Sequence, residues 1–417
     1  MKVDGKAKEA GWRIPVLLIW MIAALGVPYQ FVLQSTPNVM IPMLMQDLHI
    51  SEASIGFLTS DFFYTYLLFQ IPAGLLIDRF GVRVVLSGSL LLAAMACFLF
   101  ASAHHFALAS LSRLLMGLVT APCVPAIMYV ACNRFSPRHF VILAGLAESI
   151  GMLGGAVGEA LLGEVVTGLG WRETMLTCTI VGVVVAFLMV FFIRDTESNS
   201  RGSTEGPSFK DILRGFLEVM QNPQIWFIVL FAGLIFALLP ALAGLWIVQA
   251  LQDLYHVNIK IAALGSSMLF LGTALGLPVW GFFSEKIQRR KPVMFFATML
   301  SLLFTSGFIY WPHLPLVFVF LVLFLMGFMS AVYVLAFALV REHTSIQVRA
   351  SAMGLTNMMS MIIGAPLLQP LIGVILDHHA DHASFAYHRA FSSIVLCLIL
   401  AILSLFFIRE TYCGVKI

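Results

Sequence analysis

Twelve long apolar segments dominate this 417-residue sequence and constrain its fold more than any other feature. A helix that crosses a bilayer needs about 20 mostly apolar residues, because every backbone polar group must be bonded internally. Apolar residues make up 60% of the chain and charged residues only 11%, which excludes a soluble enzyme, a disordered chain and a fibre. We therefore predict an all-α membrane protein with twelve transmembrane helices. The segments are 14–44, 53–77, 83–102, 106–131, 138–167, 172–193, 223–252, 258–283, 292–311, 315–341, 347–376 and 388–409.

The first segment is too long for one straight span, and Pro28 and Pro37 are expected to kink it or end its regular part. More spans follow it and it lacks a small-residue cleavage site, so it is predicted to be the first helix rather than a signal peptide. The six cysteines are scattered without a CxxC pair, which indicates packing residues rather than disulfides or metal ligands. A net charge of +3 gives no reason to expect a nucleic-acid partner.

Basic residues are concentrated on one side of the predicted spans. Of the 24 Lys and Arg residues, 20 fall on the side that holds the N-terminus, three fall on the opposite side, and Arg113 lies within a span. Because loops rich in Lys and Arg stay in the cytoplasm, both termini are predicted to be cytoplasmic.

One interior stretch, residues 194–222, is polar and charged with a Gly/Ser/Pro patch. It divides the spans into two sets of six. We therefore predict an N-terminal six-helix bundle over 1–193, a cytoplasmic linker over 194–222 and a C-terminal six-helix bundle over 223–417. The second half of the linker, from Phe209 to Met220, has amphipathic spacing and is expected to lie along the membrane surface.

The two sets of spans carry an internal repeat at an offset of about 208 residues. The loop after span two reads GLLIDRFGVR and the loop after span eight reads GFFSEKIQRR, and in both an acid follows the glycine by four residues. In spans five and eleven, Gly145, Glu148 and Gly155 align with Gly354, Asn357 and Gly364. Two parallel six-span halves, with a site between them at mid-membrane, are typical of a secondary transporter.

These motifs carry a resemblance to a known family. GLLIDRFGVR resembles the loop signature of the major facilitator superfamily, and Arg113 with Gly117 in span four resembles its second motif. Four glycines of span five are similar to its glycine-rich interdomain motif, although the usual proline is absent and Glu159 stands near that place: Gly151, Gly154, Gly155 and Gly158.

The superfamily resemblance covers the whole chain. The stretches YQFVLQSTPNVM, FQIPAGLLIDRFG and LQPLIGVILD are further similar to a bacterial branch that includes phagosomal nutrient transporters, mainly in the N-terminal half. The resemblance implies two pseudo-symmetric six-helix bundles in a bacterial inner membrane, working by alternating access. Its relatives carry amino acids, nucleosides and other small solutes.

The charged residues after span two, with their repeat after span eight, are predicted to form a conformational latch. A carboxylate held against neighbouring helix ends would stabilise one closure of the two halves. The alternative is a positively charged cytoplasmic loop with a tight glycine turn. The latch candidates are Gly74, Asp78, Arg79, Gly81, Arg83, Glu285 and Arg289.

Ionisable residues within a span cost about 2.5–3.5 kcal/mol each on insertion scales, so each is a functional candidate. Asp61 and Arg113 each lie about seven residues, or roughly 10 Å, in from the same face, and are expected to pair. In the resemblance, Arg113 is tied to proton coupling and substrate placement. The alternative is a static ion pair between two helices.

Span five contributes two more candidates for proton coupling. Glu148 lies near the membrane centre, and Glu159 follows three helical turns later on nearly the same face. A desolvated carboxylate favours its protonated form, which suits a proton-coupled symporter. The alternatives are a hydrogen bond from Glu148 to a neighbouring helix and contact of Glu159 with outer water.

A polar stripe marks span one, where Gln30, Gln34 and Asn38 recur every four residues on one face. In hydrocarbon such groups need partners, either other helices or a solvated cavity, and helices one and seven line the cavity in the resembling fold. Amides and aromatic residues suggest a small polar or zwitterionic substrate. The substrate-binding candidates are Gln30, Gln34, Asn38, Tyr66, Arg113, Glu148, Trp246, Gln249, Tyr333 and Asn357.

The outer loop 377–388 holds four histidines, of which His378 and His382 have the i, i+4 spacing of metal ligands. The alternative is a solvated loop, and no metal, cofactor or catalytic residue is predicted. No GxGD, HExxH, GxSxG or P-loop motif occurs within the spans, which excludes an intramembrane enzyme. The tail after span twelve is too short for a signalling sensor.

The sequence therefore predicts a monomeric secondary transporter in the lipid bilayer of a bacterial inner membrane. It is expected to import a small polar solute such as an amino acid or nucleoside by proton symport. The alternatives are an exporter of drugs or siderophores by proton antiport, and a siderophore importer. The missing interdomain proline favours uptake, since exporter families usually keep the complete glycine-proline motif.

Overall fold

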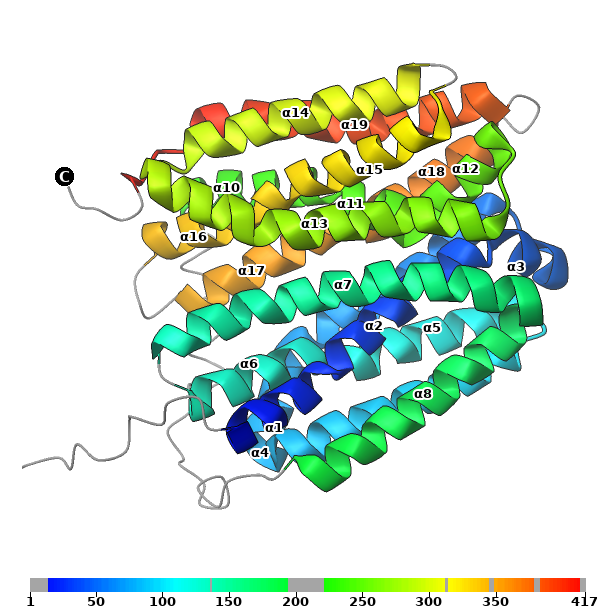
Figure 1. Ribbon diagram of the computed structural model, residues 1–417, viewed down its shortest axis with the longest axis horizontal. Coiled ribbons are helices and arrows are strands. Elements are labelled where there is room, and N and C mark those ends of the chain that lie inside the picture. Colours follow the sequence, from blue (N-terminus) through cyan, green and yellow to red (C-terminus); the bar gives the residue numbers. More distant parts are fainter. Residues whose placement is uncertain are drawn as a thin grey trace, which may run out of the picture.

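The computed structural model describes residues 14–135, 137–193, 221–311, 314–344, 349–378 and 383–412, and every regular element among them is a helix (Figure 1). The first half contains α1 (Ile14–Ala24), α2 (Gly26–Ser35), the 3₁₀ turn η1 (Thr36–Val39), α3 (Ile41–Leu48), α4 (Glu52–Ala101), α5 (Phe106–Thr120), α6 (Cys123–Arg134), α7 (Pro137–Leu169) and α8 (Trp171–Phe192).

The second half contains α10 (Pro223–Phe236), α11 (Leu238–Ala241), the π-helix η3 (Leu242–Trp246), α12 (Ile247–Tyr255), α13 (Ile259–Ile287), α14 (Lys291–Tyr310), α15 (Leu316–Ser330), the 3₁₀ turn η4 (Ala331–Tyr333), α16 (Val334–His343), α17 (Arg349–Ile362), the π-helix η5 (Ile363–Leu368), α18 (Gln369–Asp377) and α19 (Ala383–Phe407). The predicted linker 194–222 lies outside the described residues except for its last two positions.

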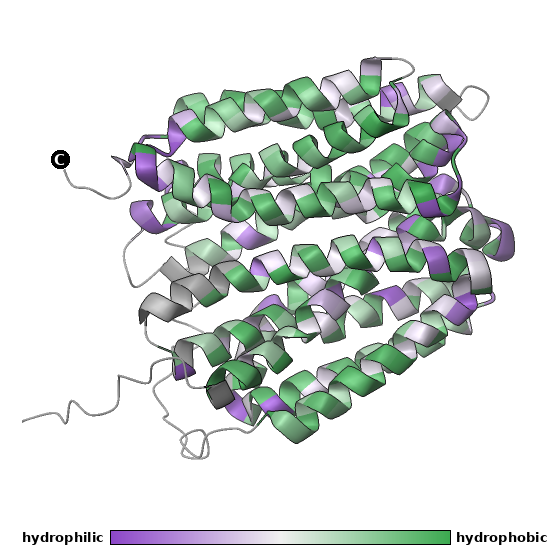
Figure 2. Cartoon of the chain, viewed as in Figure 1, coloured by the Kyte–Doolittle hydropathy of each residue, from purple (hydrophilic) through white to green (hydrophobic). Residues whose placement is uncertain are grey.

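Apolar residues cover most of the length of these helices, and hydrophilic residues gather toward their ends (Figure 2). Within the described residues, 11 helices are long and apolar enough to cross a membrane. The remaining predicted span, 53–77, forms the first part of α4. Helix is the form that such segments take because lipid offers no partner for free backbone groups. The prediction of an all-α membrane fold is confirmed.

The break inside α4 lies at Gly81, which has φ 80° and ψ 162°. A side chain would be strained in this backbone conformation, whereas glycine adopts it freely. The chain therefore turns at this glycine from the span 53–77 into the span 83–102.

Two prolines interrupt the first span as predicted. Pro28 has no N–H to offer the carbonyl four residues earlier, and α1 ends at that residue, Ala24. Pro37 is the second residue of η1, where the chain leaves the α-helical form before α3 begins. The span therefore consists of short helical pieces, and the prolines leave some of their carbonyl groups without the usual helical donor.

The helices of residues 14–192 lie side by side in one group and those of residues 223–407 in another, with α7 and α13 adjacent between them (Figure 1). We call the end of the molecule where α1 begins and α19 ends the terminal end. The opposite end, which carries α3 and the chain between α12 and α13, is the distal end. Both groups run between these two ends.

Close helix packing repeats in the two halves. A Cβ atom on Gly117 of α5 would lie 1.8 Å from the carbonyl oxygen of Phe62 in α4. A Cβ atom on Gly327 of α15 would lie 2.1 Å from the carbonyl oxygen of Leu269 in α13. The internal repeat in the sequence thus corresponds to the same helix contact in each half, and only glycine permits it.

The glycine motif of α7 receives two different neighbours. Cβ atoms on Gly151, Gly154 and Gly158 would clash with residues of α2, whereas a Cβ atom on Gly155 would lie 2.9 Å from the ring of Phe270 in α13. Three of the four glycines therefore allow α2 of the first span to pack closely against α7, and the fourth allows α13 of the second half to do so.

Candidate transport site and the contacts around it

Arg113 of α5 is fully buried and is held by backbone carbonyl groups. Its guanidinium donates to the carbonyl oxygens of Leu33 at 2.6 Å, Gln34 at 3.2 Å and Thr59 at 3.5 Å. The carbonyl of Leu33 is available because its usual helical donor, four residues later, is Pro37. The proline in span one thus creates the acceptor to which the arginine of span four donates.

The expected pair between Asp61 and Arg113 is wrong: among the described residues, no ion pair joins them. Asp61 instead accepts a hydrogen bond from the hydroxyl of Ser110 at 2.5 Å, one turn before Arg113 on α5. The guanidinium lies over the ring of Phe62, 5.0 Å from its centroid, and reaches toward span one. The two groups therefore have different hydrogen-bond partners, although their charges still interact.

Three side-chain amide atoms of the span-one glutamines lack a close hydrogen-bond partner, although Gln30 interacts with Tyr66. Gln30 and Gln34 are buried, and the side-chain amide atoms Nε2 and Oε1 of Gln30 and Nε2 of Gln34 have no hydrogen-bond partner among the described residues. Gln34 lines a cavity of about 20 Å³ between the two halves, together with Phe31, Phe63 and Phe236 among others. This volume holds about one water molecule, so the conformation described here has no room for a solute at this point.

Two hydrogen bonds join the halves beyond this cavity, on its terminal side. Asn357 of α17 donates to the side-chain carbonyl of Gln70 in α4 at 2.9 Å. The hydroxyl of Tyr333 donates to the carboxylate of Glu148 in α7 at 3.1 Å. These four polar side chains come from four different helices. Tyr66, a further candidate, is buried on α4 and stacks on Phe62.

Asn38 and Glu159 belong to a closed cluster between the halves rather than to the cavity. Both are fully buried. The side-chain nitrogen of Asn38 lies 3.2 Å from Glu159 Oε2, 2.9 Å from the carbonyl oxygen of Ala243 and 3.1 Å from the hydroxyl of Ser266. Glu159 Oε1 has no partner among the described residues.

Trp246 and Gln249 were predicted to bind substrate, but each side chain hydrogen-bonds to another residue of the protein. The indole nitrogen of Trp246 donates to the carbonyl oxygen of Gln369 at 3.0 Å, and the side chain is fully buried. The amide of Gln249 donates to the carboxylate of Glu52 at 2.6 Å. The second of these bonds joins the two halves at the distal end.

An aspartate and a helix N-terminus close the distal end. The carboxylate of Asp377, the last residue of α18, accepts from the backbone N–H groups of Glu52 at 2.9 Å and Ala53 at 3.0 Å, at the start of α4. These are among the four N–H groups that a helix leaves unpaired at its beginning. Lys260 and Glu164 form a further ion pair between the halves at this end.

Glu52 stands in this distal contact beside other acids. Burial, together with the charges of Asp377 and Asp253, raises its pKa to about 6, although the bond from Gln249 opposes the shift. Sequence reasoning missed Glu52 and Asp377. The signal for both was positional, because one begins a span and the other ends one, where an acid can meet helix-terminal N–H groups.

The terminal end carries the predicted latch residues. A Cβ atom on Gly74 would meet nothing within 4 Å, and the guanidinium of Arg79 lies 5.3 Å from the ring centroid of Phe80. The side chain of Asp78 lies outside the described part of the structure. Arg83 begins the span after Gly81 and its carbonyl accepts from Ser87 at 2.6 Å.

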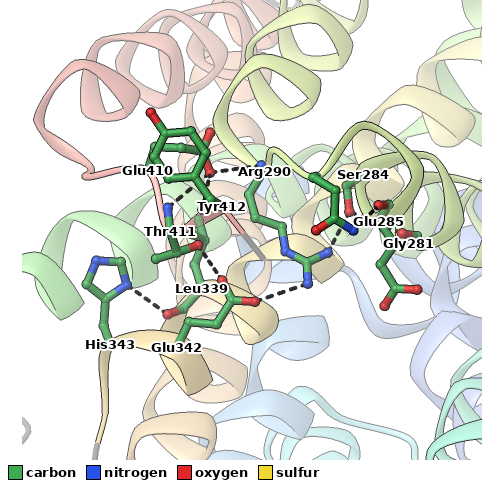
Figure 3. Close-up of polar contacts among 11 residues, drawn as sticks. Gly281, Ser284, Glu285, Arg290, Leu339, Glu342, His343, Glu410, Thr411 and Tyr412 are labelled. Carbon is green, nitrogen blue, oxygen red and sulfur yellow. Dashed lines mark hydrogen bonds and ion pairs between the residues drawn. The ribbon is translucent and has the colours of Figure 1, made fainter. Parts of the chain in front are cut away.

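In the second copy of this loop, Arg290 rather than Arg289 makes the ion pair. Figure 3 shows its guanidinium between the hydroxyl of Ser284, at 2.6 Å, and the carboxylate of Glu342, at 3.1 Å. Its backbone N–H donates to Glu410 at 3.0 Å. This cluster ties α13, α14 and α16 to the chain after α19.

The predicted residues Glu285 and Arg289 lie at the edge of the cluster. The carboxylate of Glu285 points away from Arg290 (Figure 3), and Arg289 lies over the ring of Tyr412 at 5.7 Å. The arginine nine residues after Gly281, as Arg83 is after Gly74, is Arg290, so the latch prediction of Arg289 named the neighbouring residue. Burial against α16 could not be read from the repeat.

The histidine-rich loop is described only in part, since His379 and His382 lie outside the described residues. His378 contacts the carbonyl of Val374 at 2.8 Å, and the ring of His388 lies 6.2 Å from that of Tyr310. Among the described residues, no group of three or more His, Cys, Asp or Glu side chains is placed to hold a metal ion.

Comparison with known proteins identifies relatives of this chain. The profile of the Major Facilitator Superfamily matches residues 23–252 and 238–412. The hexuronate transporter of Bacillus subtilis (strain 168) is 23% identical over 198 residues, which is 48% of this chain and 46% of that protein. The probable galactarate/D-glucarate transporter GarP of Escherichia coli (strain K12) is 27% identical over 213 residues, 50% of this chain and 47% of that protein.

The matched region thus spans about half the length of these relatives. Among solved structures, a bacterial homologue of the human lysosomal transporter Spinster has a TM-score of 0.78 at 17% identity, covering 95% of this chain and 97% of that one. The nucleoside transporter NupG has a TM-score of 0.75 at 14% identity, covering 93% and 98%. These likenesses show a shared fold over nearly the whole chain.

Proposed function

This chain belongs to the major facilitator superfamily and is a secondary transporter rather than an enzyme, and from this premise we propose that it imports a small polar solute with protons by alternating access. We assign the terminal end to the cytoplasm, because 20 of the 24 Lys and Arg residues fall on that side. The distal contacts then close the outer side of the transporter. The two bundles, 1–193 and 223–417, would rock about the cavity between them.

The buried guanidinium of Arg113 is the observation that carries the solute class. It has no carboxylate partner in an ion pair among the described residues, and it donates to the backbone of Gln34, whose side chain lines the cavity. A buried cation is stabilised best by an anion held in hydrogen-bonding geometry. A carboxylate on the solute would supply that anion, and the relatives named for hexuronate and galactarate transport agree with it.

The remaining polar groups around the cavity suit hydroxyl and amide groups of such a solute. Gln30 and Gln34 hold unpaired amide atoms, and Tyr66, Tyr333 and Asn357 come from helices on both sides. We therefore propose a sugar acid or another small hydroxylated or amino carboxylate as substrate. Asn38 and Gln249 are reassigned to the closure between the halves, and Trp246 to packing within the second half.

Proton coupling is assigned to carboxylates on α7. Glu148 and Glu159 are 11 residues apart, or roughly 16 Å along the helix, so a proton cannot pass directly between them. Each contacts a residue of the interface between the halves, Tyr333 for Glu148 and Asn38 for Glu159. Opening the interface on one side of the membrane would expose one of these two carboxylates to water and leave the other buried. Since desolvation penalises the charged form, this alternation would move protons.

The test is uptake into proteoliposomes under an imposed inward proton gradient. The panel holds labelled galacturonate, galactarate, an amino acid, a nucleoside and a ferric siderophore. We expect accumulation of a carboxylate compound that a protonophore abolishes. Proton flux driven by drugs, without accumulation of any compound, would instead indicate an exporter and overturn the proposal.

Two variants separate binding from coupling. Glu148→Gln is expected to abolish proton-driven accumulation and to leave exchange of labelled for unlabelled substrate intact. Arg113→Lys keeps the charge but loses the forked donor geometry, so exchange itself should fall about tenfold or more. Equal loss of both activities in Glu148→Gln would reduce that residue to a structural or binding role.

A further inference from the structure

Two π-helical turns interrupt the second half where it meets the first. η3 (Leu242–Trp246) lies in span seven and η5 (Ile363–Leu368) in span eleven. Such turns are rare and occur mostly at functional sites, because they widen the helix and disturb its regular pattern of backbone bonds. Nine of the 11 residues in these two turns are buried.

A side chain of the first half docks on η3. The amide of Asn38 donates to the carbonyl oxygen of Ala243 at 2.9 Å and accepts from the backbone N–H of Val248 at 3.3 Å. These two backbone groups are five residues apart, the spacing that a π-turn would join directly. The asparagine amide therefore bridges the disturbed turn from outside the helix.

Two hydroxyl groups of the first half dock on η5 in the same manner. Ser60 of α4 donates to the carbonyl oxygen of Ala365 at 2.8 Å, and Tyr64 donates to that of Pro366 at 3.2 Å. Separation of the halves at the distal end would leave these carbonyl groups without their donors. Both π-turns are thus paired across the interface in the closed state.

Asn38 alone among these docking residues also contacts a carboxylate. Its side-chain nitrogen carries two hydrogen atoms. Three acceptors lie within hydrogen-bond distance of it, on Ala243, Ser266 and Glu159. A charged carboxylate is the strongest acceptor of the three and would compete for the donor that holds Ala243. When Glu159 is protonated, the Asn38 amide would again donate fully to the carbonyl oxygen of Ala243 in η3.

We propose that Asn38 is a positioning residue which couples the protonation state of Glu159 to closure of the distal end, through its bridge across the π-turn of span seven. The proposal rests on the proton coupling proposed above. With a proton on Glu159, the amide holds Ala243 and Val248 and the halves stay closed. Without it, a buried charge faced only by neutral donors, Asn38 and Ser35, is left at the interface, which favours opening and hydration.

The experiment measures the distal opening directly. Spin labels on Leu169→Cys of α7 and His256→Cys after α12, two exposed positions at the distal end, report the distance between the halves. The background lacks the native cysteines and carries Glu52→Gln, because Glu52 is a second distal acid that titrates in the same pH range. In reconstituted protein we expect the ratio of closed to open molecules to change about tenfold or more between about pH 5 and about pH 8. Glu159→Gln should hold the closed form throughout.

Asn38→Leu, of similar size but without donors, should reduce that pH-dependent change to about twofold or less. Ser60→Ala is the matched control, because it removes one docking bond at η5 without touching Glu159. It should shift the ratio at every pH and keep its pH dependence. In the double variant of Asn38→Leu and Glu159→Gln, the two effects should fail to add, as expected for residues that act through one contact.

An unchanged pH profile in Asn38→Leu, or the same flattened profile in Ser60→Ala, would overturn the proposal. Proton-driven uptake in vesicles distinguishes this failure from failure of the proposed function. If uptake still follows the proton gradient while the distal distance ignores pH, the gate is coupled elsewhere. If neither responds to protons, the symport mechanism itself is wrong.

Discussion

Pro37 has no backbone N–H, and this explains where the side chain of Arg113 lies. Pro37 leaves the carbonyl of Leu33 without its helical donor, and the hydroxyl of Thr36 and the guanidinium of Arg113 both donate to that oxygen, at 3.0 and 2.6 Å. The position of each residue can be read from the sequence. Their contact required the fold, because 76 residues separate the proline from the arginine.

At the same scale, Gly117→Ala tests the close approach of α5 to α4. The added methyl group would meet the carbonyl oxygen of Phe62 at 1.8 Å, and a backbone atom cannot move aside as a flexible side chain does. We expect a loss of at least about 1–3 kcal/mol in the free energy of unfolding. Thermal unfolding of the detergent-solubilised protein measures it.

The control is Gly307→Ala in α14, where a Cβ atom would meet nothing within 4 Å. Alanine favours helix over glycine by about 1 kcal/mol, so this variant should be at least as stable as the wild type. Equal destabilisation in both variants would show that the contact with Phe62 does not govern the effect.

At the scale of helices, the terminal end of the second half is held by a charge cluster rather than by apolar packing alone. Arg290 joins the ends of α13 and α16, and Glu410 caps the N–H groups of Arg290 and Lys291 at the start of α14. Four helix ends are thus fixed to each other (Figure 3).

Arg290→Gln tests this cluster against its neighbour Arg289→Gln. Removal of the buried guanidinium leaves Glu342 without its ion-pair partner, which should cost about 3 kcal/mol in the free energy of unfolding. Arg289 is exposed, and its loss should change stability by about 0.5 kcal/mol or less. Thermal unfolding compares the two, and a larger loss in Arg289→Gln would show that the exposed arginine, not the buried one, fixes the helix ends.

At the scale of the whole molecule, acids of both halves meet at the distal end and make its closure depend on pH. Glu52 of α4 faces Asp377 of α18 and Asp253 of α12, and Tyr387 of α19 donates to Asp253 at 2.6 Å. The pKa of Glu52 is about 6 in the closed state, against an ordinary value of 4.5. Glu52 therefore binds a proton more tightly in the closed state than in the open state.

The sign of the dependence follows from this difference. The contribution of Glu52 to closure is fully present below pH 4.5 and is lost as pH rises through about 6. In a Glu159→Gln background, the spin-label distance between residues 169 and 256 should respond to pH in that window. Glu52→Gln should remove the response.

Asp47→Asn is the control. It removes a distal acid that does not titrate between about pH 4.5 and 6. The indole N–H of Trp171 and the guanidinium of Arg172 hold the pKa of Asp47 below its usual range, so it stays charged throughout. The pH response should survive this substitution. Survival of the response in Glu52→Gln would show that another group titrates at the distal end.

What the sequence by itself determined was the set of helices, their number, the repeat and the family. These follow from local chemistry: apolar runs in lipid must form helices, prolines end helical pieces at Ala24 and Ser35, and Gly81 permits the turn between two spans. The polar candidates Arg113, Glu148 and Glu159 were also found this way, since charge inside a span is rare and costly.

Only the tertiary structure decided which polar groups meet. It directed Arg113 to backbone carbonyls instead of Asp61, paired the buried Arg290 with Glu342, and placed Asp377 on the N-terminus of α4. The π-turns of spans seven and eleven carry no signature in a helical apolar pattern. Each outcome depends on the relative position of helices far apart in the chain, and lipid leaves a buried polar group no partner except the one that the fold provides.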